Sequence, residues 1–274
     1  MTRRAQDDLL SLHELLPLAW SAATRAGAFL RDERPDDLTV DTKSTETDVV
    51  SEMDRAAERM IVGDILGARP DDGLLGEEGS ERAGSSGVRW VIDPLDGTVN
   101  YLHRIPLWGV SIGVEVDGRT EVAVVDVPVL RETYLAVRGH GAWLVRDGEG
   151  ERLSVSDCSD LGRAVVATGF RYSVERRVAQ AAVVAGLIGQ IADIRRIGAA
   201  VVDFCWTARG RLDAYFEEGL SPWDSCAGFL IAEEAGAVVT GVGQDGTSAD
   251  FVVAGPGIHA ALREALVAAS EAAG

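Results

Sequence analysis

The stretch WVIDPLDGTVN, residues 90–100, begins as an apolar run and ends as a polar turn. The run is typical of a buried strand that ends at Asp93, because Pro94 has no N–H to donate to a neighbouring strand. Asp93 and Asp96 can then converge where the chain turns, and carboxylate oxygens are the ligands that hard cations prefer. Gly97 lets the backbone approach a ligand closely, so the following N–H groups can receive a phosphate. The stretch predicts a site for cations and phosphate, although an Asp/Gly turn capped by its own acids would explain its shorter pieces.

Helices are expected before this stretch, over residues 11–32 and 48–66, because apolar residues recur there at intervals of three and four. The second of them can also be a turn followed by a helix. Residues 68–87 are rich in Gly, Asp, Glu and Ser and are expected to be a loop. After the stretch, short alternating runs predict an antiparallel meander in which Asp117-Gly118 is a hairpin signal. The strands expected in this half cover residues 88–92, 110–116, 121–127, 133–137 and 142–145.

The second half of the chain alternates between strand-like and helix-like runs, which favours an α/β layer. Strands are expected over residues 164–168, 191–196, 213–216, 237–240 and 251–254, and helices over 175–188, 199–208, 222–235 and 258–269. The expected fold class is a layered αβαβα sandwich, with paired helices on an antiparallel sheet followed by a mixed α/β half. We expect an N-terminal α+β half over residues 8–150 that carries the metal motifs and a C-terminal α/β half over 151–272. The two halves are expected to pack as one catalytic unit.

Composition and charge exclude several classes of protein. The 274 residues are 46% hydrophobic and 26% charged, which suits a folded chain with a sizeable core. The 26 Lys and Arg against 44 Asp and Glu give a net charge of −18, so nucleic acid is not an expected partner. No apolar run has the length of a transmembrane helix, and the first residues do not resemble a signal peptide, so no membrane partner is expected. Three cysteines without a CxxC pair indicate neither a disulfide framework nor a zinc site and favour the cytoplasm.

The segment Asp93–Thr98 resembles the signature of the inositol monophosphatases, members of a lithium-sensitive, magnesium-dependent phosphatase superfamily. Three further motifs resemble that family in the expected order: the segment from Lys43 through Asp48 to Asp54, then Gly76-Glu77-Glu78, and later Trp223–Gly228, which matches Trp-Asp-x-x-Ala-Gly. Each distant acid taken alone is more often a solvated loop residue or a helix cap. Four motifs in register make the resemblance specific, and it covers residues 15–266.

The resemblance implies a set of magnesium ligands. Glu77, Asp93 and the carbonyl of Leu95 would hold the first Mg²⁺, and Asp93, Asp96 and Asp224 would hold the second, with Asp93 bridging the two. A third, weaker Mg²⁺ would lie near Glu77 and be held mainly through water. Two to three Mg²⁺ ions are therefore expected in the active site. They would screen the carboxylates of an acidic protein that handles a phosphate.

The resemblance also implies the catalytic roles. Thr98 and Asp54 would form a dyad that orients and deprotonates a metal-activated water, which attacks the phosphorus in line, and Glu77 would assist through the metals. The amides of Gly97 and Thr98 would contact the phosphate. Asp54 should stay ionised if cations are close, because nearby opposite charge favours the carboxylate.

Substrate recognition is implied for two further segments. Residues 196–200 resemble the family's Arg-x-x-Gly-x-Ala turn, in which backbone groups of Gly198, Ala199 and Ala200 would touch the sugar hydroxyls. Glu217 resembles the acid that hydrogen-bonds the ring, and Asp96 would also reach a substrate hydroxyl. Taken locally, the turn can simply serve helix packing and the glutamate can face water. Residues 169–172 resemble a bacterial variant rather than the animal relatives, which leaves the selectivity among polyol phosphates open.

The function implied is hydrolysis of myo-inositol monophosphate and related small polyol phosphates by a homodimeric enzyme. The alternatives inside the superfamily are phosphatases of fructose-1,6-bisphosphate, histidinol phosphate or adenosine 3′,5′-bisphosphate. The sequence lacks the larger insertion that a nucleotide base would need. A binding or regulatory protein that keeps the fold is the alternative of another class, and lost metal ligands would favour it. All the acids of the motifs are present.

Overall fold

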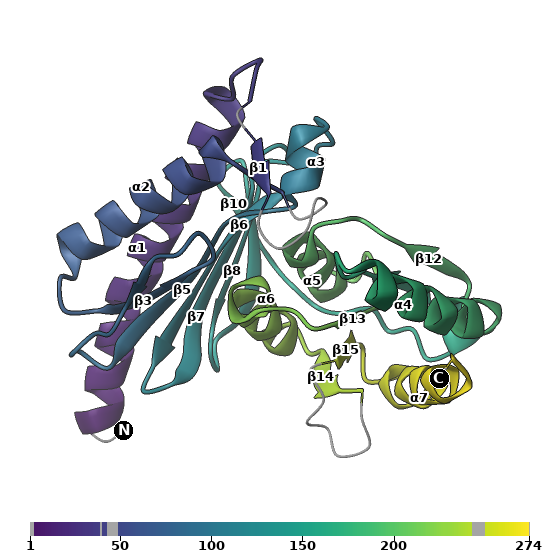
Figure 1. Cartoon of the computed structure of the whole chain (residues 1–274). Coiled ribbons are helices and arrows are strands. Elements are labelled where there is room, and N and C mark those ends of the chain that lie inside the picture. Colours follow the sequence, from purple (N-terminus) through teal and green to yellow (C-terminus); the bar gives the residue numbers. More distant parts are fainter. Residues whose placement is uncertain (1–2, 39, 43–48, 243–249, 274) are drawn as a thin grey trace.

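The computed structural model describes residues 3–38, 40–42, 49–242 and 250–273. Two sheets alternate with three layers of helices across the molecule (Figure 1). This is the expected αβαβα sandwich. The segment from Lys43 to Asp48, which belongs to the N-terminal motif, lies outside the described residues.

The larger sheet contains the stretch that carries the phosphatase-like signature. Its eight strands are, in spatial order, β10 (Glu149–Arg152), β9 (Gly141–Arg146), β8 (Glu132–Val137), β7 (Arg119–Val127), β6 (Gly109–Val116), β5 (Val88–Asp96), β3 (Gly73–Gly76) and β4 (Glu81–Arg82). Neighbouring strands are antiparallel except β3 and β5, which run parallel. Asp117 and Gly118 have φ angles of 50° and 81° between β6 and β7, the backbone that a tight two-residue hairpin needs.

The prediction of a loop over residues 68–87 is wrong, because this segment contributes β3 and β4 to the sheet. Leu74 of β3 is buried and pairs with Trp90 of β5. The strand is only four residues long and begins and ends with glycine, so its composition resembles that of a turn. Its pairing depends on burial against the neighbouring strand rather than on local composition.

Helices α1 (Arg3–Asp32) and α2 (Glu52–Ala68) lie side by side on one face of this sheet (Figure 1). They bury Leu15, Ala23 and Ile61 against apolar side chains of the sheet such as Trp90 and Ile112. Both expected helices of this half are confirmed, but their starts differ. The first begins eight residues earlier than expected, at Arg3 instead of residue 11. The second begins at Glu52, after a strand pair of β1 (Val40–Thr42) and β2 (Val49–Ser51).

The smaller sheet belongs to the second half of the chain. Its strands are, in spatial order, β12 (Asp193–Arg195), β11 (Val165–Thr168), β13 (Ala214–Glu218), β15 (Asp250–Ala254) and β14 (Val238–Gly241). Helices α4 (Val174–Leu187) and α7 (His259–Ala273) pack together on its outer face. The alternation expected for residues 164–269 is confirmed element by element.

Helices α5 (Ala200–Ala208) and α6 (Pro222–Glu234) form the layer between the two sheets (Figure 1). On the side of the larger sheet they bury Val201 and Ile231. On the side of the smaller sheet Phe204 meets Tyr215 and Phe251 in a cluster of rings with centroids 4.9 to 5.5 Å away. This dry packing fixes the N-terminal ends of α5 and α6 with respect to both sheets.

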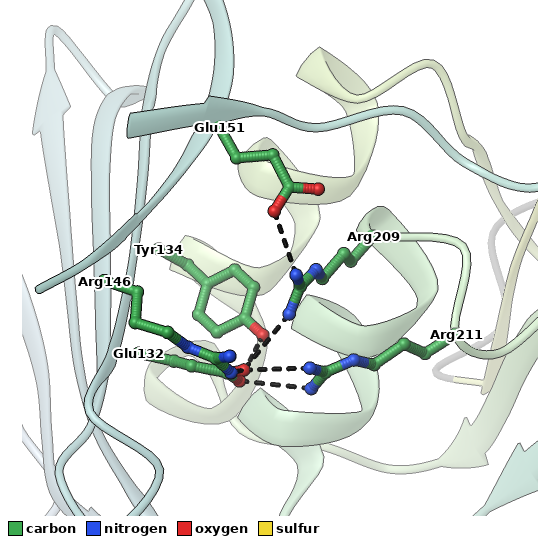
Figure 2. A network of polar contacts seen from close by, with 6 residues as sticks. All are labelled: Glu132, Tyr134, Arg146, Glu151, Arg209 and Arg211. Atoms are coloured by element: carbon green, nitrogen blue, oxygen red, sulfur yellow. Dashed lines mark hydrogen bonds and ion pairs between the residues drawn. The ribbon is translucent and has the colours of Figure 1, made fainter. Parts of the chain in front are cut away.

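A polar cluster fastens the other end of α5 to the larger sheet (Figure 2). Glu132 of β8 is fully buried and accepts hydrogen bonds from Arg209 and Arg211, which follow α5, and from Arg146 of β9. The hydroxyl of Tyr134 donates to the same carboxylate at 2.7 Å. In the part of the chain that the structure describes, no helix combines the length and the apolar character needed to cross a bilayer.

Candidate active site

The end of β5 places the acids of the signature. The pairing of β5 with β6 is regular up to Asp93 opposite Ser111, and it resumes with Asp96 opposite Gly109 after a shift in register. The strand therefore runs through Pro94 to Asp96 instead of ending at Asp93, with the irregularity at the proline. Gly97 follows with φ of 89°, a left-handed backbone that glycine adopts without strain. This geometry turns the chain sharply into the short helix α3 (Thr98–Leu102).

Asp54 lies at the start of α2 and faces Thr98. The hydroxyl of Thr98 donates to Asp54 Oδ1 at 2.9 Å and lies 3.2 Å from the carbonyl of Leu95. The other oxygen, Oδ2, accepts the backbone N–H of Ser51 at 3.0 Å and the Ser51 hydroxyl. Burial raises the pKa of Asp54, while these hydrogen bonds from Ser51 and Thr98 act in the opposite direction.

A second serine holds the acid at the start of α6. Asp224 Oδ2 accepts the backbone N–H of Ser221 at 2.7 Å, so Ser221 and Asp224 form a capping box like that of Ser51 and Asp54. Our sequence analysis missed both serines. The spacing Ser-x-x-Asp before a helical run was the signal that would have found them.

Glu77 is positioned by a buried glutamate that the sequence analysis also missed. Glu58 of α2 is 2% exposed, and its carboxylate accepts the N–H groups of Glu78 at 2.8 Å and Ser80 at 3.0 Å. A Cβ at Gly76 would lie 2.4 Å from Glu58 Oε2, so the turn after β3 can approach the carboxylate only with glycine there. Glu58 shares a helix face with apolar residues, and nothing in its local sequence marks it.

These elements surround one cleft of about 870 Å³ between the two sheets. All the site residues expected from the sequence line it except Asp54: Glu77, Asp93, Leu95, Asp96, Gly97, Thr98, Gly198, Ala199, Ala200, Glu217 and Asp224. Asp54 is 1% exposed and reaches the cleft through Thr98. Five segments that are separate in the sequence therefore meet at one place, around residues 77, 93–98, 198–200, 217 and 224.

The acids crowd one another at the floor of the cleft. Burial raises the pKa of Asp93 well above its ordinary value, and the charges of Glu77, Asp96 and Asp224 raise it further. Asp96 behaves in the same way, with burial as the main cause and Asp224 as the next, although the N–H of Val201 opposes the shift. Such a group of carboxyls favours protonation or the arrival of cations.

The donor set fits hard divalent cations. Asp93 Oδ1 accepts the N–H of Leu95 at 3.0 Å, but Asp93 Oδ2 is buried and has no hydrogen-bond partner among the described residues. The acidic side chains of the motifs that line the cleft offer carboxylate oxygens, a ligand type that suits Mg²⁺ more than zinc or copper. Among the residues that the structure describes, no three acidic, histidine or cysteine side chains form a preformed cage. The fit therefore rests on the unpartnered oxygen and on the chemistry of the donors.

The wall of the cleft next to the signature turn is built around the turn before α5, where a Cβ at Gly97 would lie 3.0 Å from the Cβ of Ala199. Gly198 has φ of 92°, and the side-chain amide of Asn100 donates to the carbonyl of Ile197 at 3.0 Å. Asp96 Oδ2 accepts the N–H of Val201 at 2.7 Å, which joins the signature to α5. Asn100 is a further residue that the sequence analysis missed, and its long-range contact leaves no local signal.

Glu217 lies in β13 and points into the same cleft. The hydroxyl of Tyr215 donates to Glu217 Oε2. Burial raises the pKa of Glu217, and the charges of Arg196 and Arg171 lower it. The alternative that Glu217 is a solvated surface residue is therefore wrong, because its carboxyl is enclosed by β13, Gly169 and these guanidinium groups.

Comparisons with known proteins agree with this geometry. The family model described as "Inositol monophosphatase family" matches residues 11–273. The "Inositol-1-monophosphatase" of Mycobacterium leprae is 40% identical over 271 residues, covering 92% of this chain and 93% of that protein. The "Nus factor SuhB" of Escherichia coli K12 is 40% identical over 233 residues, covering 84% and 85%. The crystal structure of the extragenic suppressor protein suhB from Bartonella henselae has a TM-score of 0.85 at 34% identity, covering 91% and 97%.

Proposed function

The chain belongs to the inositol monophosphatase family, and on that basis we propose that it is a Mg²⁺-dependent phosphatase of myo-inositol monophosphate and related small polyol phosphates. Family membership implies phosphatase activity in general. The cation and the class of substrate are the proposal. The observation that carries it is the meeting of the Thr98–Asp54 pair with the carboxyls of Glu77, Asp93, Asp96 and Asp224 at one cleft.

The magnesium ligands proposed are those of the family motifs. Glu77, Asp93 and the Leu95 carbonyl would hold one Mg²⁺, and Asp93, Asp96 and Asp224 would hold another, while a third ion would lie near Glu77. The unpartnered Asp93 Oδ2 supports the bridging role of Asp93. When bound, the ions would neutralise the phosphoryl oxygens and favour both the attacking water and the leaving alkoxide.

The protein's own groups would orient the reaction. The Thr98 hydroxyl donates to Asp54, so its lone pairs are directed at the cleft and can accept a proton from a water there. Asp54 would hold the proton that passes through Thr98, and Ser51 keeps its carboxylate in place. The N–H groups of Gly97 and Thr98 would bind the phosphate. Glu77 would assist at the same water, and the turn that carries it is held by hydrogen bonds to the Glu58 carboxylate.

The turn before α5, together with Glu217, would bind the alcohol part of the substrate. Backbone groups of Gly198, Ala199 and Ala200 would contact hydroxyls, and Glu217 would accept a hydrogen bond from the ring. Asp96 would serve both as a Mg²⁺ ligand and as an acceptor for a substrate hydroxyl. Its Oδ2 accepts the N–H of Val201, and its Oδ1 takes no part in that bond.

Relatives of equal identity carry two kinds of name, an inositol phosphatase and a Nus factor, so similarity alone does not select the activity. A protein with only a binding role would have no need for the catalytic acids. Their retention supports an enzyme. We also propose a cytoplasmic homodimer without nucleic acid or membrane as partners, and inhibition by lithium at the site of Asp93, Asp96 and Asp224.

The test is a panel of phosphate esters with the purified protein. Phosphate release from myo-inositol 1-phosphate, glycerol phosphates, fructose-1,6-bisphosphate, histidinol phosphate and adenosine 3′,5′-bisphosphate would be followed with Mg²⁺ and with excess chelator. We expect the highest kcat/KM for the inositol ester and no turnover with chelator. Full turnover in chelator would contradict the metal assignment, and a better nucleotide or histidinol ester would contradict the substrate class.

A further inference from the structure

One buried acid in the cleft has no role in the scheme above. Asp203 lies in the first turns of α5, is 2% exposed, and lines the same cleft as Glu217 and Gly198. The next residue in the helix, Phe204, belongs to the aromatic cluster with Tyr215 and Phe251. An acid is thus embedded in a helix that is otherwise almost entirely apolar.

One oxygen of the Asp203 carboxyl has no hydrogen-bond partner among the residues that the structure describes. This oxygen, Oδ1, is buried. The nearby hydroxyl of Thr207 donates to the backbone carbonyl of Asp203 instead of its side chain. A buried polar atom without a partner destabilises a fold, so it is retained mostly where a ligand or function compensates. Since Asp203 contributes to the wall of the cleft, the missing partner can come from a bound molecule.

The electrostatic surroundings place Asp203 near Glu217, in the part of the cleft proposed to bind the alcohol part of the substrate. The carboxyls of Glu217 and Asp96 are close enough to raise its pKa beyond the effect of burial, and the guanidinium of Arg196 lowers it. Two acids therefore lie near each other: Asp203 Oδ1 has no hydrogen-bond partner in the described part of the chain, and the Tyr215 hydroxyl engages one oxygen of Glu217.

We propose that Asp203 is a second substrate-binding carboxyl that works with Glu217, the two accepting hydrogen bonds from neighbouring hydroxyls of a cyclic polyol phosphate. This inference rests on the proposed phosphatase function and narrows its substrate class. Esters that carry adjacent free hydroxyls on a ring should be preferred over esters of the same size without them. A carboxylate is suited to this task because its oxygens accept hydrogen bonds and cannot be satisfied by an apolar ring.

The experiment compares two esters of the same ring size in the presence of Mg²⁺. The kcat/KM for myo-inositol 1-phosphate is divided by that for cyclohexyl phosphate, which lacks every hydroxyl. In Asp203→Asn this ratio should fall about tenfold, because a hydrogen bond to the carboxyl is lost or weakened. The change should be mainly in KM for the inositol ester. Glu217→Gln should lower the same ratio, and Asp126→Asn, at a buried acid outside the cleft, is the matched control.

Thermal unfolding separates binding from a structural role. Replacing a buried carboxyl that has an unpartnered oxygen should leave the unfolding midpoint of Asp203→Asn unchanged or raise it. A structural residue would lower the midpoint and scale kcat/KM alike for both esters. Asp203→Ala, checked for a folded state by circular dichroism, serves as a second variant in which no acceptor remains.

The outcomes distinguish the inference from the function on which it rests. If the unmutated protein hydrolyses neither ester, the phosphatase proposal is wrong and the inference falls with it. If it hydrolyses both equally well, ring hydroxyls are not recognised and the inference is overturned while phosphatase activity stands. If it prefers the inositol ester but both Asp203 variants keep the ratio within about twofold, the role of Asp203 alone is overturned.

Discussion

The hydroxyl of Thr98 donates a hydrogen bond of 2.9 Å to Asp54 Oδ1, although 44 residues separate the two in sequence. The bond joins the start of α2 to the turn at the end of β5. Ser51 fixes the second oxygen of the same carboxylate, so Asp54 has little freedom to turn away from Thr98. A hydroxyl held in this way is a defined acceptor and relay for a proton in the cleft.

Replacing Thr98 by valine should therefore reduce the reaction much more than binding. We expect Thr98→Val to lower kcat about 100-fold or more, the usual range for a lost acid–base group, with a small change in KM. The fold should remain, because valine fills the same space. Val99→Thr, at the exposed next position, is the control and should keep near-normal kcat. A mild loss in Thr98→Val, equal to that of the control, would remove the dyad from the mechanism.

Asp93 and Asp96 should respond differently to loss of charge. Asp93 Oδ2 has no partner in the described protein, whereas Asp96 Oδ2 holds the N–H of Val201 at the start of α5. We expect Asp93→Asn to lower activity more than Asp96→Asn and to raise the Mg²⁺ concentration needed for half-maximal activity more strongly.

The two variants should behave alike without Mg²⁺, so that the difference between them arises only with the cation. Asp93→Asn relieves the crowding with Glu77 and breaks no bond that Asn cannot replace, so its unfolding midpoint should stay or rise. Asp96→Asn likewise relieves the crowding with Asp224 and keeps an acceptor for the N–H of Val201, so its midpoint should also stay or rise. Equal and mild losses with unchanged Mg²⁺ dependence in both variants would contradict the bridging role of Asp93.

The acids of the site were predictable because each lies in a short motif with its own chemistry. Asp93 follows an apolar strand, and Asp224 follows Trp223 at the start of a helix, so type and place were both visible in the sequence. The layered fold was predictable for the same reason, since the helices and longer strands have clear periodicity. Short elements such as β3 were not predicted, because β3 forms through its pairing with β5 and the burial of Leu74 rather than through its local composition.

The residues that support the site were not predictable to the same degree. Glu58, Asn100 and Asp203 act through contacts with distant parts of the chain or with the cleft, and each lies in a helix where an acid or amide is ordinarily solvated. Ser51 differs from them, because its partner Asp54 is three residues away and the capping pattern is local. A supporting residue is thus predictable when its partner is close in sequence and is missed when the partner is distant.

Asp126 should make the stability of the protein depend on pH. It lies in β7 against Gly27 of α1, where a Cβ would be 2.2 Å from its Oδ2, and it is 6% exposed. Burial raises its pKa from 3.8 to about 6, although Thr133 and Arg31 act in the opposite direction. The folded state therefore holds this proton more tightly than the unfolded chain. The resulting stabilisation is complete below the unfolded pKa and is lost as pH rises through about 6.

Asp126→Asn removes this titration and tests it. Relative to the variant, the unmutated protein should lose about 3 kcal/mol of unfolding free energy between about pH 3.5 and about pH 7.5, since each unit of pKa corresponds to about 1.4 kcal/mol. Urea unfolding of both proteins across this range gives the difference directly. Asp36→Asn, at a fully exposed carboxyl, is the control for the loss of one acidic side chain. A flat difference for Asp126→Asn would refute the assignment.

Among the buried acids outside the cleft, we expect replacement of Glu132 to lower the free energy of unfolding most. Arg211 binds both of its oxygens, at 2.9 and 3.2 Å, and Arg209 and Arg146 bind one of them (Figure 2). Burial alone would raise the pKa of Glu132, but the Tyr134 hydroxyl and Arg211 keep it below the ordinary value. The cluster thus stabilises the fold above the unfolded pKa of the carboxyl, and this contribution is lost as pH falls through the lowered pKa.

Glu132→Gln would leave three guanidinium groups around a neutral amide. We expect the unfolding free energy near neutral pH to fall by about 2 kcal/mol, less than the 3–5 kcal/mol of a fully buried broken pair, because the arginines partly reach solvent. Glu151→Gln removes the exposed partner of Arg209 in the same network and should cost under about 0.5 kcal/mol. The unmutated protein and Glu132→Gln should converge in stability at acid pH, where the carboxyl is protonated. Equal losses in the two variants, or a Glu132 effect that persists unchanged in acid, would show that the charge of Glu132 does not hold α5 to the larger sheet.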